Sequence, residues 1–177
     1  MRKLRELKRS LKNLWRWFPI IWKDRDWDHS YIYTILEFKL RNQSDYISKA
    51  DRHTMSQKDA KDMLICAELI NKVNNDLYNM EYMDYHESEF KFSDIPDKPG
   101  FKEVEINMVV DNLDMYFSKY PTWHKRAINY IKENEHRFES DHSDRKLIAT
   151  IMSDLRQEKA KDLIFKMMSD KINGWWD

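Results

Sequence analysis

Residues that form turns are scarce in this chain, which has two glycines and four prolines among 177 residues. Domains built only from β-strands need many more turn residues, and a charged fraction of 35% is typical of long solvated helices. We therefore predict a mainly α fold of about six helices. The 41% hydrophobic content is close to the globular average and predicts one helix-rich domain over residues 1–177.

Cysteine is nearly absent, since Cys66 is the single one. A lone cysteine cannot form an intrachain disulfide, so a reducing compartment is the simpler interpretation. The apolar neighbours of Cys66 indicate a buried, inert thiol rather than a nucleophile. No apolar run approaches the roughly 20 residues that cross a bilayer, and no signal peptide is recognisable. These absences predict a soluble protein that stays in the cytoplasm.

Charge is distributed unevenly, although the net charge of the chain is zero. Residues 1–17 contain seven Arg and Lys residues and one Glu, a net charge of +6. Leucines recur there at three- and four-residue steps, at Leu4, Leu7, Leu11 and Leu14. We predict a basic amphipathic helix over residues 1–18 that ends at Pro19. Its leucine stripe could pack on the protein body or a second copy, which we favour, or its basic face could contact an anionic membrane or nucleic acid.

Helical periodicity explains most of the remaining chain. The predicted helices begin at or just after Asp28, Ser56, Asp111, Pro121 and about Ile148. The helix that begins at Asp28 is expected to direct an apolar stripe toward the core, and this stripe includes Ile32 and Leu40. The helix from Ser56 is expected to continue to about Met80, and the last to end at Gly174. The paired Trp175 and Trp176 that follow are expected to dock on the core.

Between residues 88 and 110 the apolar period changes to two, as in Phe90 and Phe92 and again in Val104 and Ile106. This pattern predicts a small β-hairpin insertion with a long loop. A two-stranded sheet is marginal alone, so the hairpin needs cover from the helices or from another chain. Together with the leucine stripe of the first helix it predicts a homo-oligomer, for which we expect a dimer.

Aromatic and charged residues are most concentrated in the segment 22–31, with the sequence WKDRDWDHSY. Indole rings offer flat stacking surfaces, while Arg, Lys and His supply donors for anions. Two further polar segments, 51–54 and 82–89, also fall at predicted helix ends, and we expect all three to converge on one concave surface. The predicted ligand-binding residues are Trp22, Lys23, Arg25, Trp27, His29, Arg52, His53, Tyr85 and His86.

No motif in the sequence supports catalysis, a cofactor or a metal. The Asp-x-Asp-x-Asp run at 24–28 copies the start of a calcium loop, but His29 stands where that loop requires glycine. His86 has no second histidine at helical spacing. A protein that is not an enzyme and holds neither a cofactor nor a metal is therefore predicted.

Several strings together resemble a family of uncharacterised small proteins encoded by tailed bacteriophages. They are FPIIWKDRDWDH at 18–29, DRHT at 51–54, MEYMDYH at 80–86 and the closing WWD. The resemblance covers most of the chain and implies a viral protein in the cytoplasm of a bacterial host. Accessory phage proteins of this kind are often anti-defence factors, and some sequester cyclic nucleotide immune signals. That parallel is one of role, not of descent.

The leading hypothesis is a phage anti-defence protein that binds and sequesters a nucleotide-like anion without catalysis, with a cyclic nucleotide immune signal as the expected ligand. Aromatic rings for the bases and cationic side chains for the phosphates are what such a site needs. One alternative is an inhibitor that binds a host defence or replication protein through the same aromatic segments. Another is a hydrolase built around His29, His53 and His86. Nucleic acid is a partner that the pattern does not favour.

Overall fold

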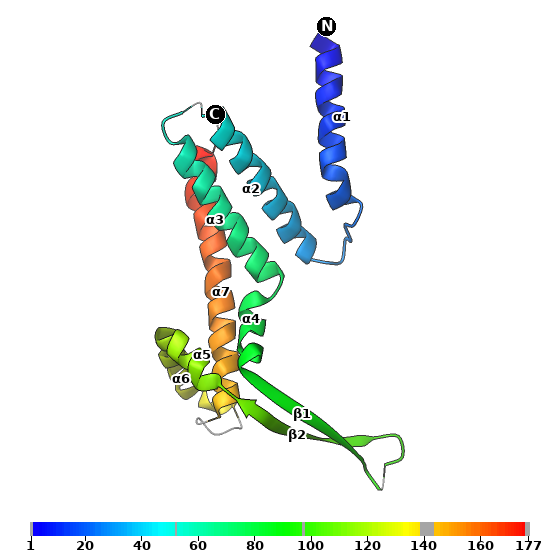
Figure 1. Cartoon of the computed structure of the whole chain (residues 1–177), viewed down its shortest axis with the longest axis vertical. Helices are drawn as coiled ribbons and strands as arrows, with labels where there is room; N and C mark the ends of the chain where they lie inside the picture. Colours follow the sequence, from blue (N-terminus) through cyan, green and yellow to red (C-terminus); the bar gives the residue numbers. More distant parts are fainter. Residues whose placement is uncertain (1, 52, 97, 139–143, 176–177) are drawn as a thin grey trace. The chain divides into compact units, whose positions relative to one another are not determined.

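The structure, a computed structural model, describes residues 2–51, 53–96, 98–138 and 144–175. This part of the chain forms seven α-helices and one antiparallel hairpin, which confirms the predicted mainly α fold with a small β insertion (Figure 1). The helices are α1 (Arg2–Ile21), α2 (Ser30–Ala50), α3 (Ser56–Asn74), α4 (Leu77–Met80), α5 (Leu113–Lys119), α6 (Pro121–Glu133) and α7 (Arg145–Lys171). The strands are β1 (His86–Asp94) and β2 (Lys102–Asp111). None of the described helices is both long and apolar enough to cross a membrane.

The contacts divide the chain into two compact units. Unit 1 is Met1–Asn75 with Leu163–Asp177, and it contains α1, α2, α3 and the last part of α7. Unit 2 is Asp76–Asp162, and it contains α4, the hairpin, α5, α6 and the first part of α7. The predicted single domain requires the two units to unfold together. This stays a prediction.

In unit 1, α2 and α3 lie side by side and form the core. Leu40 and Ile47 of α2 are buried, as are Met63 and Ile70 of α3. Cys66 lies in the same buried row of α3, as the sequence predicts. The three- and four-residue spacing of these apolar side chains is what places them on one side of each helix.

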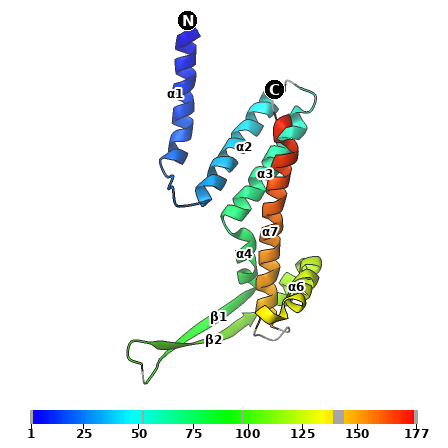
Figure 2. The same ribbon diagram turned by 180° about the vertical axis from the view of Figure 1, so that it is seen from behind.

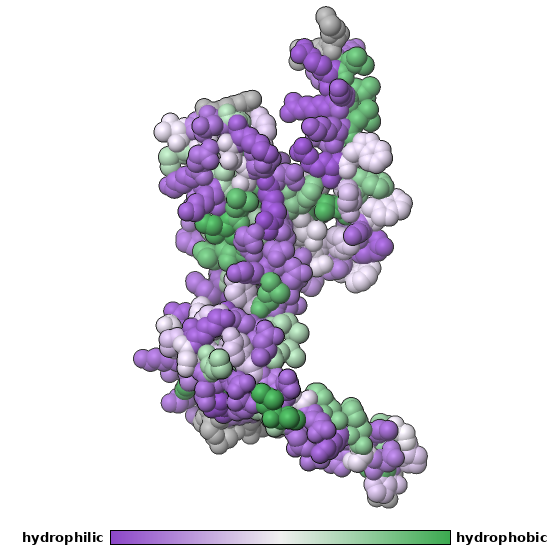
Figure 3. Space-filling view, in the orientation of Figure 1, coloured by the Kyte–Doolittle hydropathy of each residue, from purple (hydrophilic) through white to green (hydrophobic). Residues whose placement is uncertain are grey.

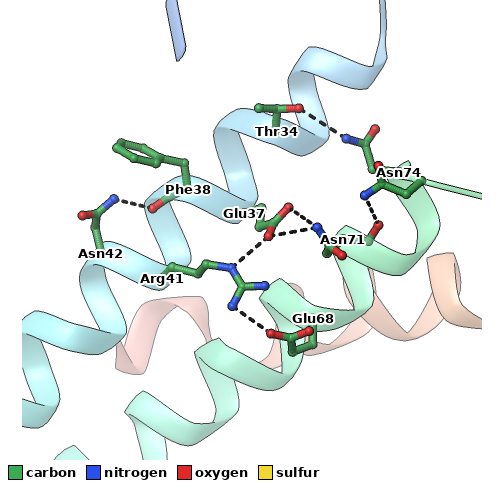
Figure 4. A network of polar contacts seen from close by, with 9 residues as sticks. Thr34, Glu37, Phe38, Arg41, Asn42, Glu68, Asn71 and Asn74 are labelled. Carbon is green, nitrogen blue, oxygen red and sulfur yellow. Dashed lines mark hydrogen bonds and ion pairs between the residues drawn. The ribbon is translucent and has the colours of Figure 1, made fainter. Parts of the chain in front are cut away.

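A polar network fixes the register of α2 on α3 (Figure 4). The Glu37 carboxylate accepts hydrogen bonds from Arg41 at 2.8 Å and from Asn71 at 3.2 Å. The Arg41 guanidinium also pairs with Glu68 of α3 at 2.8 Å. Since these bonds are directional, they select one sliding position of the two helices from the many that apolar packing alone would tolerate.

The first helix departs from the prediction, because α1 continues through Pro19 to Ile21. Proline lacks the N–H that bonds to the carbonyl four residues earlier, but so near the helix end this removes a single bond. The N–H of Trp22 still donates to the carbonyl of Phe18 at 2.9 Å, which completes the last turn. The prediction that Pro19 ends the helix is therefore wrong.

The next two helices also differ in detail from what the sequence predicts. The N-cap of α2 is His29 and not Asp28 as the sequence predicts, although the Asp28 carboxylate accepts the N–H of Ser30 at 2.9 Å. Ile32, however, is 63% exposed and does not face the core. The third helix ends at Asn74 and not near Met80, because Asp76 adopts a left-handed conformation with φ of 50°. A left-handed residue cannot continue a right-handed helix, and a short separate helix follows.

The leucine stripe of α1 is not packed on the protein body. Its members are between 44% and 75% exposed: Leu4, Leu7, Leu11, Leu14, Trp15 and Phe18. The helix instead meets α2 through Trp17, whose ring lies edge-on to Phe38 with the centroids 4.9 Å apart. The prediction that the leucines face the body of this chain is therefore wrong, while contact with a second copy stays a prediction.

In unit 2, a small core joins α5, α6 and α7. Its fully buried members include Leu113 and Tyr116 of α5, Ala127 of α6 and Met152 of α7. The hairpin leaves this core at His86, which is 8% exposed and stacks on Tyr82. The predicted insertion at about 88–110 is thus confirmed, with strands slightly longer than expected.

The hairpin has one apolar and one polar face. Phe90 pairs with Ile106 and Phe92 with Val104, so these four side chains share a face. The intervening positions, such as the pair formed by Lys91 and Glu105, point to the opposite face. All four apolar residues are between 46% and 62% exposed. The alternation thus creates an apolar strip that nothing in the described part of unit 2 covers.

Arg156 of α7 is the main polar element inside unit 2, and it is 8% exposed. Its guanidinium pairs with the carboxylate of Glu81 at 2.8 Å and donates to the hydroxyl of Tyr116 at 2.9 Å. It also stacks on the ring of Tyr120 at 3.8 Å. A buried cation is costly unless it is paired, so this cluster commits Glu81 to the interior of unit 2.

We expect Phe90→Ser combined with Ile106→Ser to convert a dimer into a monomer, because the apolar strip of the hairpin needs cover. Multi-angle light scattering at tens of micromolar should give twice the 21.8 kDa chain mass for the unaltered protein and the chain mass for the variant. Lys91→Ser with Glu105→Ser is the matched control on the polar face and should stay dimeric. A monomeric unaltered protein would contradict the prediction.

We expect Glu81→Gln to reduce the free energy of unfolding by about 1–3 kcal/mol at neutral pH, because it removes a charge-assisted bond to Arg156. Burial tends to raise the pKa of Glu81, but hydrogen bonds from Lys119, Tyr120 and Arg156 together lower that pKa below its ordinary 4.5. The stabilisation is therefore present above about pH 4.5 and is lost as the pH falls through the lowered pKa.

Urea unfolding at several pH values would measure this effect. The difference between the unaltered protein and Glu81→Gln should shrink below pH 4.5. The exposed Glu105 provides a control, since Glu105→Gln removes a carboxylate at the surface and should leave the free energy of unfolding at neutral pH unchanged. An unchanged difference between the two proteins at low pH would argue against the pairing.

Candidate anion-binding site

The predicted binding residues between α1 and α2 all lie at the surface. Trp22 is 71% and Trp27 83% exposed, and Lys23, Arg25 and His29 are exposed as well. The Arg25 guanidinium donates to the neighbouring carbonyl of Asp24 at 2.8 Å. This segment therefore forms an open connector, not the wall of a cavity, and its role in binding stays a prediction.

The connector does not meet the segment 51–54, with which the sequence predicts convergence. The two lie at opposite ends of α2 (Figures 1 and 2), and this 21-residue helix spans about 30 Å at 1.5 Å per residue. The prediction that these two segments share one surface is therefore wrong. Arg52 lies outside the described residues.

The predicted residues of unit 2 are occupied by contacts within that unit. His86 stacks on Tyr82, and its Nδ1 lies 3.1 Å from the Tyr82 carbonyl oxygen. Tyr85 packs against Tyr116, and its hydroxyl accepts a hydrogen bond from Lys119 at 3.3 Å. These contacts engage both side chains within unit 2, where His86 is buried and Tyr85 is partly buried.

His53, Ser56 and Asp59 form a serine–histidine–aspartate contact that resembles a hydrolase triad in composition only. His53 lies 2.9 Å from Asp59 and 3.1 Å from the Ser56 hydroxyl. That hydroxyl is fully buried, donates to the His53 carbonyl at 2.7 Å and accepts the His53 N–H. Because the hydroxyl is committed to closing the first turn of α3, it does not meet the requirements of a nucleophile. Nor does His29 support the hydrolase alternative, since α2 separates it from His53.

Two further kinds of reactive centre are a free thiol and a bound metal ion. Burial raises the pKa of the Cys66 thiol to about 11, so the reactive thiolate is scarce at neutral pH. In residues 2–51, 53–96, 98–138 and 144–175 there is no group of three side chains placed to hold a metal ion.

A groove between α1 and α2 has the properties of an anion site. It has a volume of about 460 Å³, within the range of small-molecule sites. Its lining comes from one side of α1, from one side of α2 and from Trp175. The lining residues are Arg9, Arg16, Lys39, Asn42, Gln43, Tyr46, Ile47 and Trp175. We call this hollow the cationic groove.

Among the residues that the structure describes, the lining of the cationic groove carries three positive charges and no carboxylate. Arg9, Arg16 and Lys39 form no ion pair with any residue that the structure describes. The adjoining hollow does contain Asp45, but Lys49 neutralises it at 2.6 Å. Three uncompensated cations around one hollow create a positive potential that an anion would relieve.

Trp175 closes one wall of the cationic groove and is 2% exposed, as the predicted docking of this residue requires. Its main-chain carbonyl accepts a hydrogen bond from Gln43 at 2.6 Å. The indole Nε1–H is buried and has no acceptor in the described part of the chain. Such an unpaired buried donor costs about 1–3 kcal/mol of folding free energy. The indole N–H therefore lacks an acceptor among the described residues, just as the three cations of the groove lack one there. Trp176 lies outside the described residues.

A second groove, between α6 and α7 of unit 2, has about the same size at 410 Å³ but the opposite charge balance. Arg126 and Lys159 line it together with three carboxylates, those of Glu133, Glu158 and Asp162. Its aromatic wall could support stacking, yet the excess of carboxylates disfavours a phosphate. Charge therefore selects the cationic groove as the candidate anion site.

The sequence contains the pattern of this groove, although periodicity alone does not show which helix the basic face meets. Arg9 and Arg16 lie seven residues apart on α1, as Lys39 and Tyr46 do on α2, so each pair shares one side of its helix. The sequence predicts that the leucines pack on the protein body or on a second copy, and it offers the basic face to a membrane or nucleic acid and not to α2. The signal that could have identified the site is a basic stripe on one helix facing a carboxylate-poor side of the next.

Comparison of the chain with protein families, curated proteins and solved structures gives no match.

We expect Trp27→Ala to change the free energy of unfolding by no more than about 0.5 kcal/mol, because the indole is largely in water. Trp175→Ala, which truncates a buried indole, should cost about 3–5 kcal/mol. Thermal melting of both variants beside Arg25→Ala provides the measurement. A sharp loss of stability in Trp27→Ala and Arg25→Ala would mean that the connector is a structural cluster and not an open surface.

Proposed function

We propose that this protein is a non-catalytic binding protein that holds a nucleotide-like anion in the cationic groove. The observation that carries the proposal is the set of three cations, Arg9, Arg16 and Lys39, that line one hollow without a carboxylate partner in the described chain. Structural cations are normally neutralised, as Arg156 is by Glu81. Arg9, Arg16 and Lys39 are exposed to solvent, and their summed positive potential in one hollow attracts an anion.

The groove also offers the other parts that a nucleotide needs. Tyr46 lies at its wall with half of its surface exposed, which suits stacking of a base. Asn42 and Gln43 add amide groups at the same wall. Their amide nitrogens donate to the carbonyls of Phe38 and Trp175, so both side chains are already oriented. Oriented polar groups beside free cations favour a ligand that combines phosphates with a polar aromatic base.

The resemblance to phage proteins suggests the class of ligand and the purpose of binding. A phage protein that holds a cyclic nucleotide signal would act by lowering its free concentration in the host cytoplasm. This requires binding without turnover. The hydroxyl of Ser56 and the thiol of Cys66 are buried, so neither of these two groups is placed to act as a nucleophile. We therefore propose sequestration, with a cyclic dinucleotide or oligonucleotide as the ligand.

We expect a thermal-shift screen with cyclic di- and trinucleotides to reveal a stabilising ligand, since binding at about 100 times the dissociation constant adds about 2.7 kcal/mol. Calorimetric titration of that ligand should show at least a tenfold weaker affinity in Arg9→Ala with Arg16→Ala, because each charge-assisted contact is worth about 1.5–3 kcal/mol. The affinity should also fall as the salt concentration rises.

Two controls locate the site. Arg5→Ala with Lys12→Ala removes the same charge from the same helix, but neither residue lines the groove, so this variant should bind almost normally. Arg25→Ala tests the connector, and a loss of binding in this variant alone would move the site there. The ligand should be recovered intact after denaturation of the complex. Recovery of a cleaved product, or no stabilisation by any member of the panel, would contradict the proposal.

A further inference from the structure

The outward face of α1 is a second feature that the proposed groove does not use. Figure 3 shows a hydrophobic band on the side of α1 that faces away from α2, with hydrophilic side chains projecting toward α2. We call six exposed apolar and aromatic residues of α1 the outer stripe: Leu4, Leu7, Leu11, Leu14, Trp15 and Phe18. An apolar strip of this length on one helix requires a partner that removes it from water.

The helical period explains why the stripe is turned outward. Phe18 and Arg9 are nine residues apart, which is about two and a half turns and places them on opposite sides of the helix. Leu7 and Arg16 have the same separation. Because Arg9 and Arg16 line the cationic groove against α2, the leucines must face away from it. The contact between Trp17 and Phe38 holds the helix in this rotation.

The charges beside the outer stripe decide which partner fits. Lys3 and Lys8 border the stripe on its two edges, and Arg5 and Lys12 follow behind Lys8. The first 17 residues contain a single acidic residue, Glu6. A second α1 helix would bring the same cations against these, whereas paired helices normally match opposite charges across their edges. A surface that is apolar within and negative at its boundary has the complementary pattern.

The aromatic residues of the stripe support the same partner. Trp15, Phe18 and Trp22 form a continuous group at the end of α1, with ring centroids 6.2 Å and 5.2 Å apart, and both indoles are more than 70% exposed. Tryptophan prefers the boundary between hydrocarbon and headgroups, because its ring is apolar and its N–H is polar. A helix with leucines, flanking lysines and such a group is suited to lie in the plane of that boundary.

We infer that α1 binds the surface of an anionic lipid bilayer through the outer stripe, with the helix lying parallel to the membrane and the flanking cations at the headgroups. The partner is a lipid surface, which the helix coats without crossing. This inference does not rest on the proposed ligand, since the groove and the stripe use opposite sides of α1.

Vesicle flotation of the full chain tests this inference. The protein should float with vesicles of phosphatidylglycerol and phosphatidylcholine in equal parts, and its partition coefficient should be at least about tenfold lower for phosphatidylcholine alone. Leu7→Ser with Leu11→Ser should abolish flotation. Leu64→Ser with Ile65→Ser is the matched control, because it removes two exposed apolar residues from α3, each 42% exposed, and this variant should float normally.

A second variant and a second measurement complete the test. Trp15→Ser should also weaken flotation, so the inference stays testable if the double leucine variant does not fold. Equal flotation with both kinds of vesicle, or none with either, would overturn the inference. So would normal flotation of both stripe variants. Light scattering without vesicles tests whether a second copy covers the stripe. If the unaltered protein is a dimer and the leucine variant is a monomer, a second copy covers the stripe and the lipid inference fails.

Discussion

The contact between Trp17 and Phe38 is the constraint on which the functional arrangement depends. Its centroid distance of 4.9 Å and edge-on geometry fix the rotation of α1 about its own axis beside α2. A rotation by half a turn would bury the leucines against α2 and expose the arginines. One aromatic contact therefore determines that the basic face meets α2 and that the apolar face meets the surroundings.

Cations play two different parts in this protein, and their partners distinguish them. Arg156 is buried, and its guanidinium pairs with Glu81, donates to Tyr116 and stacks on Tyr120, so its charge is compensated within unit 2. Arg9 and Arg16 lie at the surface and have no counter-ion in the described chain. The difference in pairing, and not the difference in residue type, is why only the second set suggests binding.

The two faces of α1 differ in their chemistry. The groove face is positive and faces polar side chains of α2, while the outer stripe is apolar with positive edges. A protein that bound lipid by the stripe would still leave the cationic groove open on the other side of the helix. Sequestration of an anion and attachment to a surface would then be compatible in one molecule, because they compete for no side chain of the stripe or the groove.

Much of the fold could be predicted from local patterns. The scarcity of glycine and proline indicated a helical protein, the change of apolar period located the hairpin, and the apolar neighbours of Cys66 indicated its burial. These properties depend on the order of residues within one element, so the sequence contains them directly. The errors in the predicted helix ends were also local. Asp76 is left-handed and ends α3 early, although no glycine at this position indicates such a conformation.

The candidate site was decided by tertiary structure. The sequence determined that the arginines and leucines of α1 lie on opposite faces, but not which of them meets α2, because periodicity defines a face without defining its neighbour. It likewise identified the aromatic connector and the segment at 51–54, but not that the rigid α2 holds them at its two ends. Segments at helix ends meet only if the helices fold back in the right register. That register comes from directional contacts between distant residues, such as those of Glu37 and Arg41 with α3.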